Sequence, residues 1–245
     1  MKQIRNLTIL LLLLALLGAC SQASKMQRMS VDEKMARGNE FYELEKWRKA
    51  IPYFQEVVFE RKTAYTDDAQ RKLADCYFFM ENWVDARYEY QELIRLFPDY
   101  EDIGTAYFSI GLCYFEESLN YHYTQDETYE SMDAFSTFLE RFPGDERAAE
   151  AQDYLVQARY KLLEKAYMNG YIYWRINDYS AALLYFDDVR AAGLDDEIDR
   201  KAIYYSARIY LEREDMGAAH PIIVELKERY PESAEARRLE KHLEQ

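Results

Sequence analysis

The sequence predicts an all-α protein built from repeated helical hairpins. Only 8 glycines and 5 prolines interrupt the 245 residues, and apolar residues recur at helical spacing rather than in the alternation that strands require. Small and aromatic residues also recur at fixed offsets, with a period of about 34 residues, which suits one helix-turn-helix unit. About 215 residues follow Ser30, enough to bury a sizeable core.

The N-terminus has the layout of a lipoprotein signal peptide. Two basic residues precede the apolar run Leu7 to Leu17, whose length of about 11 residues is too short for a membrane-spanning helix of roughly 20. The motif Leu17-Gly18-Ala19-Cys20 then resembles the lipobox of bacterial lipoproteins. We expect residues 1–19 to be removed as a signal peptide and Cys20 to carry lipid. The alternative is an ordinary signal peptide with an accidental cysteine.

The residues after the cysteine predict where the protein is held. In the Gram-negative lipoproteins that this N-terminus resembles, an aspartate in the next position tends to retain the protein at the inner membrane, and here that position is Ser21. We therefore expect a lipid anchor at the periplasmic face of the outer membrane, made permanent by its acyl chains. Residues 20–30 form the lipidated tether, because they are polar and carry no clear periodicity.

The chain is strongly acidic, with a formal net charge of −14. Lys2 and Arg5 are the only charged residues in 1–19, so removing this segment lowers the charge from −14 to −16. Nucleic acid and anionic lipid headgroups are poor partners for such a surface. Beyond Cys20 the sequence contains only Cys76 and Cys113, which fall at equivalent repeat positions. We expect both to be buried and unpaired, although an oxidising compartment would permit a disulfide.

The repeat pattern is a small residue, an aromatic three positions later, another after six more, and an alanine after three more. Small residues let two antiparallel helices approach closely, and the aromatics fill the space between neighbouring units. We expect Ala86, and Ala182 in the fourth unit, where two helices cross. This is the tetratricopeptide pattern, so we predict a tetratricopeptide-repeat superhelix of about five units. The first two units contain Gly38, Phe41, Trp47, Ala50, Phe54 and Val57, then Ala74, Tyr77, Trp83, Ala86, Tyr90, Leu93 and Pro98.

Three further units complete the chain, the third interrupted by an insertion of about eight residues near 119–128. The stretch 146–167 is longer than one repeat helix needs and can continue into the fourth unit. We expect it to divide the repeats into an N-terminal part, 31–145, and a C-terminal part, 146–245, with a capping helix at 234–243. The pattern residues are Gly111, Tyr114, Ser131, Phe135, Phe138 and Pro143; Gly170, Tyr173, Tyr179, Ala182, Phe186 and Val189; and Ala207, Tyr210, Met216, Ala219, Ile223, Leu226 and Pro231.

In tetratricopeptide folds the first helix of each unit faces the concave side, and the register predicts which side chains line this groove. The predicted groove is rich in aromatic rings, each of which buries on the order of 150–250 Å² when covered. We expect it to bind extended, aromatic-bearing polypeptides, with arginines pairing carboxylates. Packing between repeats and ion pairs to nearby acids are the alternatives for individual residues. The predicted groove residues are Tyr42, Arg71, Phe78, Phe79, Phe108, Phe115, Tyr167, Tyr171, Trp174, Arg175, Tyr204 and Arg208.

The lipobox, the short tether, five repeats and the segment DAFSTFLERFP at 133–143 resemble the BamD (YfiO/ComL) family over essentially the whole chain from Cys20. This resemblance implies an outer-membrane lipoprotein of the β-barrel assembly machinery, bound to the POTRA domains of the barrel protein BamA. It also implies a role in receiving unfolded outer-membrane proteins, whose C-terminal signals are rich in aromatic residues. No motif marks individual contacts to BamA.

The sequence does not favour catalysis. His122, His220 and His242 lack the spacing of a zinc helix, and phosphate loops and nucleophile elbows are absent. Acidic runs such as 195–197 suit helix N-termini or solvated faces. We expect a non-enzymatic protein without metal or cofactor. The alternative function is a different binding role, as a secretin pilotin or a scaffold for peptidoglycan enzymes.

Overall fold

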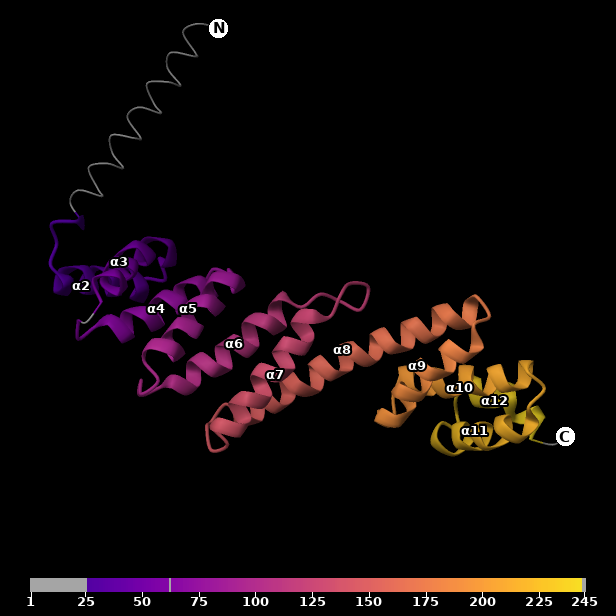
Figure 1. Ribbon diagram of the computed structural model, residues 1–245. Coiled ribbons are helices and arrows are strands. Elements are labelled where there is room, and N and C mark those ends of the chain that lie inside the picture. The colour runs from indigo at the N-terminus through magenta and orange to yellow at the C-terminus, as the bar shows by residue number, and fades with distance from the viewer. Residues whose placement is uncertain (1–25, 62, 244–245) are drawn as a thin grey trace, which may run out of the picture. The chain divides into compact units, whose positions relative to one another are not determined.

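The protein is an all-α tetratricopeptide-repeat structure, as the sequence predicts. A computed structural model describes residues 26–61 and 63–243, and over these residues the chain forms helices and no β-strand. The predicted signal peptide, Cys20 and the start of the tether lie outside the described residues. Successive helices pair as hairpins (Figure 1). The helices are α2 (Val31–Glu43), α3 (Trp47–Glu60), α4 (Thr66–Phe79), α5 (Trp83–Leu96), α6 (Ile103–Glu117), α7 (Asp126–Arg141), α8 (Ala148–Arg175), α9 (Tyr179–Ala192), α10 (Glu197–Glu212), α11 (Met216–Arg229), α12 (Ala234–Leu239) and the 3-10 turn η1 (Glu240–His242).

The described chain divides into two compact units. Unit 1 contains residues 26–117 together with 137–148, and unit 2 contains residues 118–136 together with 149–243. The sequence pattern predicts a division after residue 145. In the structure, the insertion and the first part of α7 belong to unit 2, and the rest of α7 belongs to unit 1. The second boundary between the units falls at the start of α8.

The first hairpin of unit 1 shows why the small residue of the repeat is needed. A methyl group built on Gly38 would lie 2.7 Å from Cε1 of Phe54, a ring that is fully buried. Helix α2 starts at a capping box, in which Ser30 Oγ accepts from the Glu33 N–H and the Glu33 carboxylate accepts from the Ser30 N–H. Lys34, only 4% exposed, reaches across to two glutamates of α3. The hairpin is therefore held by close packing and by ion pairs between a buried lysine and two partly exposed glutamates.

The turns within four hairpins share one backbone conformation. Glu45, Glu81, Asn177 and Glu214 each have a positive φ, between 54° and 62°. Each of them lies two residues before the second helix of its hairpin, which starts at Trp47, Trp83, Tyr179 or Met216. A residue in the left-handed region of φ/ψ space lets the chain reverse within a short turn. Non-glycine residues adopt this conformation only where the surrounding structure holds them in it. The repeat thus extends to the turn backbone, although no glycine marks it.

Unit 2 is organised around α8, a single helix of 28 residues. Its length confirms that the amphipathic stretch before the fourth unit continues into the first helix of that unit. The C-terminal half of α8 packs on α9, where a methyl group on Gly170 would lie 2.7 Å from the buried ring of Phe186. Ala182 on α9 and Ala86 in unit 1 are both fully buried. The small and large positions of the pattern therefore meet across this hairpin as they do across the first.

The insertion between α6 and α7 is attached to α8 by two lysines. Lys165 Nζ donates to the carbonyl oxygens of Tyr123 at 2.7 Å and Tyr121 at 3.3 Å, and Lys161 Nζ lies 2.8 Å from Ser118 Oγ. The buried Gln125 side chain also donates to backbone carbonyls within the insertion. These contacts explain why the insertion belongs to unit 2.

The C-terminus of the described chain is a short cap, as predicted. Helix α12 continues into η1, and Ala236 and Leu239 pack against Ile223 and Leu226. Cys76 and Cys113 are buried and unbridged, and burial raises the pKa of each thiol to about 12. Among the described helices, none combines the length and the apolarity that a membrane span requires.

Candidate functional site

Five aromatic rings from the first two hairpins of unit 1 form a continuous chain of contacts, which we call the unit 1 ring cluster. Tyr42 meets Trp47 edge-on at 5.1 Å, and Trp47 stacks on Phe79 at 4.7 Å. Phe79 in turn contacts Phe78, which meets Trp83 at 5.2 Å. Phe79 remains 53% exposed although it is stacked on one face. An aromatic ring held in this way offers an apolar surface on which a further side chain can be buried.

A buried carboxylate, Asp75, ties three helices of unit 1 together beside this cluster. Its oxygens accept hydrogen bonds from the hydroxyls of Tyr42 on α2 and Tyr90 on α5, each at 2.7 Å, and it is ion-paired with Arg71 on α4. Burial, followed by the charge of Asp75, raises the pKa of both tyrosines, so both donate as neutral phenols. Of the two roles considered for Arg71, the structure shows the ion pair to a neighbouring acid.

The third hairpin contributes less of an open surface than the sequence predicts. Phe108 on α6 is 6% exposed and packs edge-on against Phe138 at 5.4 Å, so it is a core residue. Phe115, on the same helix, is half-buried. The reason is that α5 covers one side of α6 and α7 covers another. Side chains of α6 that the register predicts to line the groove are therefore packed between helices.

A second group of rings, the unit 2 ring cluster, contains Tyr167, Tyr171, Trp174, Tyr204 and Tyr205. Tyr171 lies 6.4 Å from Tyr167 and 5.6 Å from Trp174, and Trp174 lies 4.6 Å from Tyr205, which contacts Tyr204. All five are half-buried. Burial is the main cause that raises the pKa of Tyr167 and of Tyr205, which keeps these phenols neutral. The cluster contains four of the predicted groove residues.

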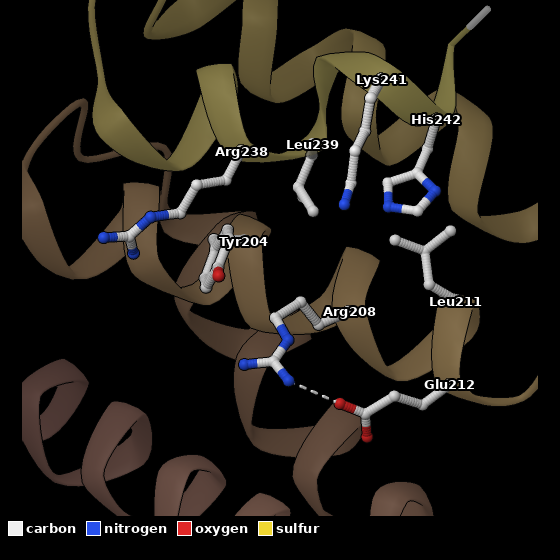
Figure 2. Close-up of a pocket in the computed structure, with 8 residues that line it drawn as sticks. All are labelled: Tyr204, Arg208, Leu211, Glu212, Arg238, Leu239, Lys241 and His242. Atoms are coloured by element: carbon white, nitrogen blue, oxygen red, sulfur yellow. Dashed lines mark hydrogen bonds and ion pairs between the residues drawn. The ribbon is translucent and has the colours of Figure 1, made fainter.

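Arg208 joins this cluster to a pocket of about 400 Å³ at the C-terminal cap. Its guanidinium carbon lies 4.9 Å from the ring centre of Trp174 and 5.9 Å from that of Tyr204. One of its nitrogens lies 2.8 Å from the carboxylate of Glu212. Arg175 is exposed at the end of α8 and, among the described residues, makes no ion pair. Figure 2 shows the pocket between α10 and the cap, lined by Tyr204, Arg208, Leu211, Glu212, Arg238, Leu239, Lys241 and His242.

Sequence reasoning missed residues of both clusters and of the pocket. The sequence pattern marks Trp47 and Trp83 only as repeat positions, whereas in the structure their rings complete the unit 1 ring cluster. Tyr205 lies next to a predicted groove position, and the helical register alone did not assign it inward. The cationic side of the pocket comes from the cap, whose polar residues carry no repeat signal. The signal that could have indicated this side of the pocket is the group of basic residues in the cap of an otherwise acidic chain.

These surfaces consist mainly of aromatic rings and arginine side chains. Within residues 26–61 and 63–243, no group of three or more histidine, cysteine, aspartate or glutamate side chains is arranged to hold a metal ion. The described clusters instead combine aromatic faces, which bind apolar side chains, with arginines that pair with carboxylates.

Repeated helical hairpins define a tetratricopeptide-repeat protein. The chain belongs to the YfiO family of outer membrane lipoproteins, whose family model matches residues 27–190. It is 24% identical over 123 residues to the outer membrane protein assembly factor BamD of Caulobacter vibrioides. That match covers 49% of this chain and 37% of the relative, so the chain spans little more than a third of that protein in the comparison.

Solved structures that resemble this one also contain tetratricopeptide repeats. The TPR2AB domain of yeast Sti1 in a complex with pHSP90 is 15% identical, with 84% of this chain and 80% of that chain covered and a TM-score of 0.46. A tetratricopeptide repeat protein from Parabacteroides merdae is 14% identical, with coverage of 94% and 90% and a TM-score of 0.44.

Proposed function

We propose that this protein is a non-enzymatic, lipid-anchored subunit of the outer-membrane β-barrel assembly machinery. Membership of the YfiO family carries the proposal, and the name of the curated relative, an outer membrane protein assembly factor, supports it. In this proposal, lipid on Cys20 holds the chain at the periplasmic face of the outer membrane. The residues that follow it, up to Ser30, give the repeats room to reach partners in the periplasm.

The two ring clusters are the surfaces that we propose for polypeptide binding. Phe79 in unit 1 and the half-buried tyrosines around Trp174 in unit 2 offer apolar area beside hydrogen-bonding hydroxyls. An extended, unfolded outer-membrane protein carries aromatic and aliphatic side chains that such surfaces bury. The proposed stable partners are the POTRA domains of a BamA-like barrel protein and other subunits of the assembly machinery.

Crosslinking and co-purification of the lipidated protein in mild detergent test this proposal. We expect a POTRA-containing barrel protein to be recovered in about equal amount, as for an obligate subunit. Depletion of the protein should then lower the amounts of many unrelated outer-membrane barrels. Recovery of a secretin or of peptidoglycan enzymes in place of the barrel protein would contradict the proposal and favour the pilotin or scaffold role.

Phe79→Ala is expected to weaken the capture of an aromatic-bearing, unfolded outer-membrane polypeptide by about tenfold. The substitution removes an aromatic contact worth about 1 kcal/mol together with the area that the ligand buries on the ring. Binding of a labelled client peptide, measured by fluorescence anisotropy, checks this result. The same substitution at Phe78 adds a structural cost, because Phe78 packs on Trp83, so the double variant needs a helicity measurement.

Phe59→Ala is the matched control for this prediction. Phe59 is 82% exposed on α3 and is not a predicted groove residue, so its loss should leave peptide affinity unchanged. Equal affinities of the Phe79→Ala variant and the native protein would remove the unit 1 ring cluster from the proposed binding surface.

A further inference from the structure

A second pocket, of about 420 Å³, lies within unit 1, between the first hairpin and the second. We call it the α5 pocket; its lining includes Val58 from α3, Gln70 from α4, and Glu89 and Leu96 from α5. None of the five rings of the unit 1 ring cluster lines it. Its volume lies in the range of sites that enclose a small organic molecule. The pocket is therefore separate from the surfaces that we propose for polypeptides, and it is large enough for a ligand of its own.

The walls of the α5 pocket are mostly apolar. Val58 and Leu96 provide aliphatic surface, and Leu96 is 38% exposed. Phe97, directly after α5, and Tyr88, which is 58% exposed, add two aromatic rings. A ligand that covers these side chains gains free energy, because their apolar area is removed from water. The walls therefore favour a ligand with an apolar body.

The polar side of the pocket contains an unpaired carboxylate, that of Glu89. The amide of Gln70, a residue only 1% exposed, donates to Glu89 Oε2 at 2.5 Å and to the Glu89 carbonyl oxygen at 3.1 Å, which fixes the orientation of the carboxylate. Burial raises the pKa of Glu89, because the charged form is poorly solvated there. Within residues 26–61 and 63–243, no lysine or arginine forms an ion pair with this carboxylate. A cationic ligand would supply the missing partner.

The second carboxylate of the pocket, Glu92, is already compensated. It forms an ion pair of 2.5 Å with Arg95. The hydrogen bond from Arg95, together with the charges of Arg95 and Arg61, lowers the pKa of Glu92. The charged residues that line the pocket are thus two glutamates and one arginine, which leaves one negative charge for a ligand, at Glu89. A ligand with a single positive charge is complementary to this site, and an anionic ligand is repelled by it.

We propose that the α5 pocket binds a small organic amine in its protonated form, with the ammonium group on the Glu89 carboxylate and the apolar body against Val58 and Leu96. An ammonium group donates charge-assisted hydrogen bonds to a carboxylate, and the ring of Tyr88 provides a further face for a cation. The unbranched stem of a lysine side chain leaves part of these walls uncovered, so the ligand is a compact aryl or branched alkyl amine rather than a basic side chain of a protein.

Such a ligand contacts α3, α4 and α5 at once, so its binding stabilises the packing of the first hairpin on the second. This inference goes beyond the proposed assembly role and does not depend on it. Its test uses purified protein and a synthetic amine, whereas the assembly role is tested by co-purification. Failure of either experiment therefore leaves the other conclusion unchanged.

The probe is 2-phenylethylammonium chloride, and its uncharged counterpart of nearly the same shape is 2-phenylethanol. Each is titrated by calorimetry into the lipidated full chain in micelles of an uncharged detergent, with a micelle blank. We expect saturable binding of the amine and at least about tenfold weaker binding of the alcohol. Absence of saturable amine binding, or equal affinities of amine and alcohol, would overturn the proposal.

Glu89→Gln tests the role of the carboxylate. The amide has nearly the same shape and still accepts from Gln70, so helicity should be unchanged, and the affinity for the amine should fall by at least about tenfold, to that of the alcohol. The matched control is Asp85→Asn, which removes the same charge from an exposed position one turn earlier on α5, outside the pocket. It should change the affinity by less than about twofold. An equal loss in both variants, or in neither, would contradict the role of Glu89.

Leu96→Ala tests the apolar wall without changing any charge. It should lower the affinity for the amine by about threefold or more, because less apolar area is buried by the ligand. Since Leu96 is partly exposed, we expect the variant to fold. Val84→Ala is the matched control, because Val84 is 54% exposed on the same helix and lies outside the pocket. An unchanged affinity for Leu96→Ala would place the amine elsewhere and overturn the proposal.

Discussion

Replacing Asp75 by alanine is expected to destabilise unit 1 by about 3–5 kcal/mol, because it removes the buried carboxylate that pairs with the half-buried Arg71 and leaves Arg71 only its longer contact to Asp68, at 3.7 Å. The hydroxyls of Tyr42 and Tyr90 lose their acceptor as well, and Tyr90 is only 2% exposed. Asp75→Asn should fall between the native protein and Asp75→Ala, since an amide oxygen still accepts but carries no charge. Urea denaturation followed by tryptophan fluorescence measures the change.

The three tryptophans allow this measurement to be made on each unit separately. Trp47 and Trp83 lie in unit 1 and Trp174 lies in unit 2, so a Trp174→Phe background reports on unit 1 alone. Asp68→Ala is the comparison variant, because Asp68 lies on the same helix and is 37% exposed, and it pairs with Lys72 at 3.0 Å and with Arg71 only at 3.7 Å. Its cost should stay below about 1 kcal/mol. A loss of similar size for both variants would contradict the structural role assigned to Asp75.

Phe186→Ala is expected to destabilise unit 2 by about 3–5 kcal/mol, through lost burial and the cavity that the substitution creates. Phe186 is fully buried, and its ring lies over Gly170 and between Tyr167 and Tyr205. Urea denaturation in a background where Trp47 and Trp83 are phenylalanine reports on unit 2. Leu184→Ala, on the same helix but 66% exposed, should change stability by no more than about 0.5 kcal/mol.

A double-mutant cycle with Gly170 tests the packing itself. Gly170→Ala alone should destabilise unit 2 by about 1–3 kcal/mol, because the new methyl group would lie 2.7 Å from the Phe186 ring. In the Phe186→Ala background the ring is gone and the methyl group enters the cavity. The combined cost should therefore be smaller than the sum of the single costs by about 1 kcal/mol or more. Strict additivity would mean that these two positions do not meet, and that the repeat register assigned to this hairpin is wrong.

The repeat register could be predicted from the sequence because it depends on local spacing. Gly38 with Phe54, and Gly170 with Phe186, are separated by the same 16 positions, and in both hairpins the glycine faces the ring. The short connecting turn leaves the paired helices few ways to align, so the small residue of one meets the large residue of the other. The long helix α8 and the cap followed from helical periodicity for the same reason.

The open and closed parts of the predicted groove could not be separated from the sequence. Phe79 and Phe108 both occupy inward positions of a first helix, yet one is 53% exposed and the other 6%. The difference depends on which neighbouring helices cover each position, and this is set by contacts between segments far apart in the chain. The sequence likewise leaves two roles open for Arg71, pairing a ligand carboxylate or pairing a neighbouring acid, and the structure shows the pair with Asp75.

The sequence by itself determined the all-α class, the repeat unit, the pairing of small and aromatic positions, and the likeness to the family to which the chain belongs. Each of these depends on the order of residues within one or two helices. The tertiary structure alone decided that the insertion belongs to unit 2, that Phe79 stays open, and that Arg208 of α10 meets Arg238 and Lys241 of the cap. These features require segments about 30 residues apart or more to be brought together. The free energy that places them comes from burying apolar surface and pairing charges across helices, which no local pattern encodes.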